Sequence, residues 1–147
     1  MFLVSLKGNQ VKGESVTFDI NKTIKYWIDG AAYDFETGKR LLEIKRFPYA
    51  LFFGHLAIEK VLKALVVKTT KDHAPHTHSL PSLAKRAKVE IPETIIDKFA
   101  EFMEFHIESR YPGEKTDFYK LCTEEFASKK FLDIEEVYKW LIKKLEL

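Results

Sequence analysis

The chain is short of the residues that build several common kinds of site. Its 147 residues include one cysteine, Cys122, which excludes an internal disulfide and a cysteine-based metal cage. The six glycines are scattered and form no phosphate-binding loop. No run of about 18 apolar residues is present to span a membrane, and the apolar start Met1–Val4 is too short for a signal peptide. We therefore expect a soluble, cytoplasmic protein.

Groups that signal an enzyme are also scarce. The closely spaced aspartates of a metal-dependent nucleotidyltransferase or nuclease are missing, and no serine lies in a nucleophile elbow. Charge is nearly balanced, with 24 basic and 22 acidic residues and a net charge of +2, so no overall positive field favours nucleic acid. We expect no catalytic residues and no cofactor. RNA is a weaker candidate ligand than a nucleotide.

What the chain does have is apolar residues at helical spacing. Hydrophobic residues make up 46% of a length that fits one domain with its own core. Helices are expected from an Asn21 N-cap to Leu42, from Phe47 to about Lys68, from a Ser79 cap to Ala87, from Pro92 to near Arg110, and from about Glu124 to Leu145. The spacing predicts an all-α fold, an up-and-down antiparallel bundle of four to five helices over residues 21–147. Residues 1–20 contain two short β-like runs and are predicted to form an N-terminal arm or hairpin.

The helix predicted from Phe47 to Lys68 is apolar on almost every side, which is typical of a central helix. His55, Glu59 and Lys63 interrupt it as a polar row at four-residue spacing. One interpretation is a structural ion pair between Glu59 and Lys63. The other is a ligand site in which Lys60 or Lys63 neutralises a phosphate while Glu59 orients the lysines.

Three further residues are candidates for ligand binding. His78 comes directly before the expected cap Ser79, where an anion could approach the start of a helix. Arg110 is expected at a helix C-terminus, which favours a cation, but its guanidinium could also bind a phosphate with two hydrogen bonds. Tyr111 would offer a ring on which a base can stack. His73 and His76 lie close to His78, but no second group of metal ligands accompanies them, so we expect no metal site.

In their order and spacing, these motifs resemble the HEPN domain family (higher eukaryote and prokaryote nucleotide-binding). The resemblance covers Ile24 to Leu145. It rests on Trp27-x-x-x-Ala31-x-x-Asp34, Phe52-Phe53, Glu59-Lys60-x-x-Lys63-Ala64, His78-Ser79-Leu80 and Arg110-Tyr111-Pro112.

The resemblance implies a helical bundle that commonly forms a homodimer. The branch that this chain resembles is often encoded beside a minimal nucleotidyltransferase, in two-component systems similar to toxin–antitoxin pairs, and nucleotide binding has been proposed for it. We therefore expect a protein that binds a nucleotide or phosphorylated ligand together with such a partner. The expected ligand-binding residues are Glu59, Lys60, Lys63, His78, Arg110 and Tyr111.

Other members of the family are metal-independent ribonucleases with an arginine followed, after four to six residues, by a histidine. None of the four arginines of this chain has a histidine at those positions. A ribonuclease would need a non-standard pairing, such as Arg110 with His106 or His78. It stays an alternative, as does a pure protein-interaction module.

Overall fold

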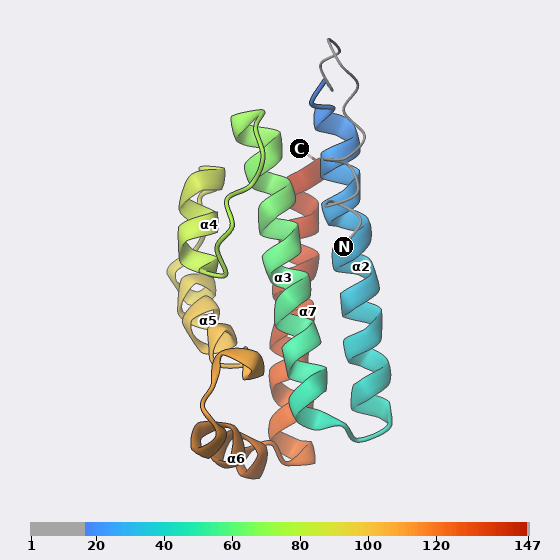
Figure 1. Ribbon diagram of the computed structural model, residues 1–147, viewed down its shortest axis with the longest axis vertical. Helices are drawn as coiled ribbons and strands as arrows, with labels where there is room; N and C mark the ends of the chain where they lie inside the picture. Colours follow the sequence, from blue (N-terminus) through green and yellow to red (C-terminus); the bar gives the residue numbers. More distant parts are fainter. Residues whose placement is uncertain (1–16, 147) are drawn as a thin grey trace, which may run out of the picture.

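The computed structural model describes residues 17–146, which fold into a helical bundle (Figure 1). Three long helices lie side by side: α2 (Ile20–Glu43), α3 (Phe47–Thr70) and α7 (Glu124–Glu146). Helix α2 runs opposite to α3 and α7, and the shorter segments between α3 and α7 return the chain to the end where α7 begins. No strand occurs within residues 17–146. The predicted all-α, up-and-down bundle is confirmed.

The return segment is made of short elements. They are α4 (Leu80–Ala87), α5 (Glu93–Met103), the 3₁₀ turn η1 (Ile107–Ser109) and α6 (Pro112–Leu121). Helices α4 and α5 lie on the side of α3 away from α2, and α6 lies at one end of the bundle (Figure 1). The core sits around α3, as its apolar sequence predicts. Its largest fully buried side chains include Leu51, Ile58 and Leu62 from α3, Phe99 and Phe102 from α5, and Ile134 and Leu141 from α7.

Two helix starts test the capping predictions. Ser79 caps α4 as predicted, because its hydroxyl oxygen accepts a hydrogen bond from the Ser82 N–H at 3.2 Å. The prediction that Asn21 caps the first helix is wrong. The cap is Asp19, whose carboxylate accepts from the Lys22 N–H at 3.0 Å. The N-terminal arm predicted over residues 1–20 lies almost entirely outside the described residues.

The prediction of one helix from Pro92 to Arg110 is also wrong. Helix α5 ends at Met103, and Phe105 and Ile107 beyond it are both buried. Residues two apart on a helix point to opposite sides, so a continued helix would have exposed one of these two side chains. Pro112 then begins α6, which is not among the predicted helices, since proline suits the first turn of a helix.

Candidate functional site

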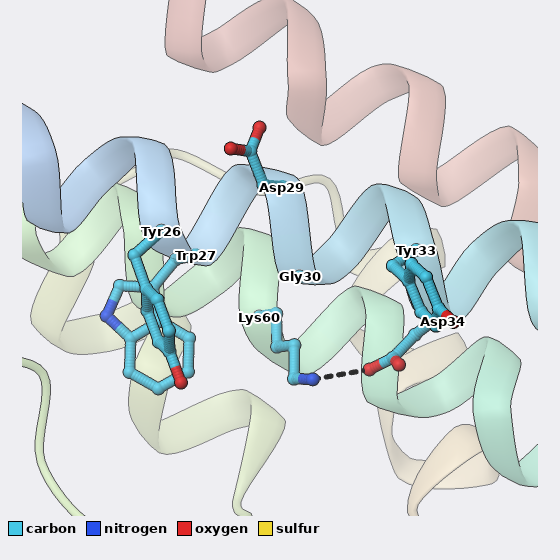
Figure 2. A pocket seen from close by; sticks show the side chains of 7 residues that line it. All are labelled: Tyr26, Trp27, Asp29, Gly30, Tyr33, Asp34 and Lys60. Atoms are coloured by element: carbon cyan, nitrogen blue, oxygen red, sulfur yellow. Dashed lines mark ion pairs between the residues drawn. The ribbon is translucent and has the colours of Figure 1, made fainter. Parts of the chain in front are cut away.

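An open pocket lies along α2, where aromatic side chains meet a lysine from α3 (Figure 2). It measures about 530 Å³, within the range of small-ligand sites. We call it the aromatic pocket, and its lining residues are Tyr26, Trp27, Asp29, Gly30, Tyr33, Asp34 and Lys60. Tyr33 is 77% exposed, so a ligand can reach it from solvent. The pocket therefore offers aromatic rings and an amine to one ligand.

Lys60 is held at this pocket by Asp34. The Lys60 Nζ lies 2.7 Å from Asp34 Oδ2, in a pair whose carboxylate is almost buried and whose amine is about one-third exposed. Gly30 leaves room for the lysine, because a Cβ on Gly30 would lie 3.3 Å from Lys60 Cδ. The sequence did not predict this pair, because it joins residues 26 positions apart on neighbouring helices.

A second polar group surrounds Glu59 beside this pocket. Glu59 and Lys63 are only 4% and 7% exposed, and Glu59 Oε2 lies 3.1 Å from Lys63 Nζ. The other carboxylate oxygen, Oε1, lies 3.0 Å from His78 Nδ1. Lys63 Nζ also lies 5.1 Å from the centre of the Trp27 ring, in a cation–π contact. Glu59 thus links a wall of the aromatic pocket to the loop that carries His78.

On the other side of His78 is a smaller pocket of about 190 Å³. We call it the histidine pocket, and it is lined by His55, His78, Ser79, Met103, His106 and Ser109. The ring centres of His55 and His78 lie 5.1 and 5.0 Å from that of His106. Three of the five histidines of the chain therefore meet here, although they are far apart in the sequence. Within residues 17–146, no group of three or more histidine, cysteine, aspartate or glutamate side chains is arranged to hold a metal ion.

His55 is the most buried member of this group, with no exposed surface. Burial, which disfavours the charged ring, is the main reason that the pKa of His55 falls from 6.5 to about 4. The nearby His106 and His78 lower the pKa further, whereas the Phe52 carbonyl and Glu59 raise it. His55 is therefore neutral at physiological pH.

Arg110 and Tyr111 have partners of their own. The Arg110 guanidinium donates hydrogen bonds to the Glu104 carbonyl and lies 4.6 Å from the centre of the Phe118 ring. The Tyr111 side chain is 78% exposed, and its backbone N–H donates to the Glu114 carboxylate at 3.1 Å. Of the six expected residues, the structure joins Glu59, Lys63 and His78 directly and places Lys60 beside them on α3. A ligand role for Arg110 and Tyr111 stays a prediction.

Sequence reasoning missed the aromatic pocket and the meeting of the histidines. Tyr26 and Tyr33 are seven residues apart, a spacing that puts two exposed rings on one face of a helix and could have indicated the pocket. His55 was visible as part of the polar row on α3. Nothing in the sequence placed His106 beside it, because the turn after α5 sets that position.

The fold and its pockets define a small helical-bundle domain with two ligand-sized cavities on either side of a buried polar network. The family model for the HEPN domain matches residues 24–145, so the chain belongs to the HEPN domain family. The structure is also similar to the crystal structure of TT1696 from Thermus thermophilus, with a TM-score of 0.69 and 18% sequence identity. That similarity covers 82% of this chain and 97% of TT1696, and at this identity it shows the fold alone. No curated protein sequence matches the chain. Among the helices described, none is long and apolar enough to cross a membrane.

Proposed function

We propose that this HEPN protein binds a nucleotide or a related phosphorylated ligand in the aromatic pocket. The observation that carries the proposal is the position of Lys60 Nζ on the wall of a cavity lined by Tyr26, Trp27 and Tyr33. Aromatic rings stack on any base, and a lysine amine binds phosphate as a point charge. Both halves of a nucleotide therefore find a suitable surface in one pocket.

Asp34 sets how strongly Lys60 can bind a phosphate. Its carboxylate neutralises the amine in the free protein, and a phosphate has to compete with it for the same positive charge. Lys63 is too buried to meet a ligand directly, and its contact with Trp27 instead supports the ring. Lys60 is thus the phosphate-binding residue, Lys63 and Glu59 position the pocket wall, and Asp34 weakens binding.

The test is a titration of the protein with ATP, followed through amide NMR shifts. Saturable shifts are expected around Trp27, Tyr33 and Lys60. Lys60→Ala should weaken binding about tenfold, as expected for a lost charge-assisted hydrogen bond. Asp34→Asn should strengthen binding, because it frees the amine.

Lys45→Ala is the control. Lys45 is an exposed lysine that pairs with Glu124 at 3.0 Å, and its loss should leave ATP affinity unchanged. Equal weakening of ATP binding by Lys45→Ala and Lys60→Ala would mean that ATP responds only to the net charge of the protein and not to the position of Lys60. An absence of saturable shifts at millimolar ATP would reject the nucleotide site.

The proposal extends to partners. We infer a homodimer that acts with a minimal nucleotidyltransferase in a two-component, toxin–antitoxin-like system; membership of the HEPN family and the motifs quoted above support this. Light scattering should give twice the chain mass. Co-expression with a minimal nucleotidyltransferase from the same genome should give a complex that survives size exclusion, and separate elution would reject the partner while leaving the nucleotide site untouched.

A further inference from the structure

Two nitrogen atoms in the histidine pocket have no hydrogen-bond partner. Within the described part of the chain, His55 Nε2 and His106 Nδ1 are both buried and unpaired. A buried polar atom without a partner costs about 1–3 kcal/mol, so such atoms call for an explanation. Both residues line the same cavity, which is large enough to admit the missing partner.

The chemistry of His55 can be assigned from its other ring nitrogen. His55 Nδ1 lies 2.6 Å from the Phe52 carbonyl oxygen, which can only accept a hydrogen bond. Nδ1 therefore carries the proton, and Nε2 of the neutral ring carries a lone pair. The pocket thus contains a fixed, uncharged hydrogen-bond acceptor that no side chain of the described residues uses.

The partner of this acceptor must donate a hydrogen bond. An amino group can donate one proton to His55 Nε2 and a second to His106 Nδ1, whereas a hydroxyl can donate to His55 Nε2 and accept from His106 Nδ1 when that nitrogen carries the proton. A phosphate dianion has no proton to donate, so the phosphate group of the ligand expected in the aromatic pocket does not suit this acceptor. Within residues 17–146 no group of three or more histidine, cysteine, aspartate or glutamate side chains could hold a metal ion, so a metal ion is not the partner we propose.

The size of the pocket limits the rest of the ligand. An apolar cavity of about 150 Å³ is known to hold one benzene molecule, and the histidine pocket measures about 190 Å³. The Phe52 ring, centred 5.4 and 5.5 Å from the His55 and His106 rings, provides aromatic surroundings close by. Met103 adds a polarizable apolar wall.

We propose that the histidine pocket is a second binding site, separate from the aromatic pocket, for an uncharged one-ring ligand that carries an amino or hydroxyl group. His55 Nε2 accepts a hydrogen bond from that group, and His106 Nδ1 is its second partner. The ring fills the remaining space beside Met103.

The experiment compares probes of one size: aniline, phenol and toluene. Each is titrated into the full chain at neutral pH while the side-chain nitrogen signals of the histidines are recorded by NMR. Aniline and phenol should bind about tenfold more tightly than toluene, because a probe without a donor leaves both nitrogens unpaired. The His55 Nε2 signal should move from the position of a free lone pair towards that of a hydrogen-bonded nitrogen.

His55→Phe keeps a ring in the pocket but removes the acceptor, so the preference for aniline over toluene should disappear. His76→Phe makes the same change at an exposed position of the loop before α4 and should keep the preference. Equal affinity for aniline and toluene in the unaltered protein would overturn the proposal, as would binding of Zn²⁺ alone at the same nitrogens. The nitrogen signal of the unaltered protein decides the matter even if His55→Phe does not fold. The outcome of the ATP titrations, including that of Lys60→Ala, does not affect the aniline and toluene titrations. Either proposal can therefore be rejected without the other.

Discussion

The two pockets on either side of the Glu59 network differ in how a polar side chain is accommodated in an apolar bundle. In the aromatic pocket the charge of Lys60 is retained and matched by Asp34 at 2.7 Å. In the histidine pocket His55 carries no charge, since burial keeps its ring neutral, and its Nε2 has no hydrogen-bond partner. The difference teaches two things about ligands. A paired charge predicts a ligand that competes with the internal counter-charge. An unpaired neutral acceptor predicts a ligand that donates the missing hydrogen bond.

Glu59 lies between the two pockets and pairs with both Lys63 and His78, so its loss should have the largest effect. Glu59→Ala leaves Lys63 buried and without a counter-charge, which typically destabilises a protein by about 3–5 kcal/mol. It also releases His78 on the side of the histidine pocket. Urea unfolding measures the change in the free energy of unfolding. Glu43→Ala, which removes an exposed partner of Arg40, should leave the free energy of unfolding nearly unchanged. Similar losses for both variants would show that the Glu59 network is not the buried link described here.

The neutral state of His55 predicts a particular dependence of stability on pH. The pKa is 6.5 for an ordinary histidine and about 4 in the folded protein, so between these values the unfolded chain binds a proton that the folded chain does not. The stabilising contribution is present above pH 6.5 and is lost as pH falls towards 4, by about 1.4 kcal/mol per pH unit within that window.

Unfolding free energies measured from pH 4 to 7 should therefore decline less steeply for His55→Phe than for the unaltered protein. His76→Phe serves again as the exposed control and should keep the original slope. Parallel curves for His55→Phe and the unaltered protein would mean that His55 takes up its proton equally in both states, contrary to its burial.

Substitutions at two helix glycines, Gly30 in the aromatic pocket and Gly54 in the core, should have different effects. A Cβ on Gly54 would lie 2.8 Å from Ile134 Cδ1 and 3.1 Å from Phe131 Cε1, both in the packed core. Gly54→Ala should therefore destabilise the fold by about 1–3 kcal/mol, as overpacking does. Gly30→Ala meets only the flexible stem of Lys60 and should leave stability nearly unchanged while weakening ATP binding a few-fold. Thermal unfolding and ATP titration of the two variants check this contrast.

The smallest expected effect is at the C-terminal end of α4, the opposite end from Ser79. Lys88 ends this helix with a φ of 55°, a left-handed conformation that suits glycine better than a residue with a side chain. Lys88→Gly should stabilise the protein by about 1 kcal/mol, seen as a higher urea midpoint. ATP affinity should not change, because the aromatic pocket lies along α2, whereas α4 lies on the other side of α3. A destabilised Lys88→Gly variant would show that the side chain of Lys88 contributes more than its strain costs.

Much of the fold could be predicted, because apolar spacing reports directly on helices. The central position of α3 followed from its apolar surface, and the Ser79 cap followed from the residue type. The prediction of one helix from Pro92 to Arg110 was wrong, because the spacing of residues does not show that Phe105 and Ile107 are both buried in the core. The candidate site was predicted in part. Glu59, Lys63 and His78 meet as one network, but the positions of Asp34 beside Lys60 and of His106 beside His55 could not be predicted.

By itself, the sequence determined that this protein is an all-helical HEPN domain with a polar row on its central helix, since periodicity and motif order are local properties of the chain. Only the tertiary structure decided which side chains face one another. Asp34, His78 and His106 come from distant segments to lie beside Lys60, Glu59 and His55, and the packing of these segments against α3 sets their distances. Burial, which makes His55 neutral and Lys63 dependent on Glu59, exists only once those segments have packed.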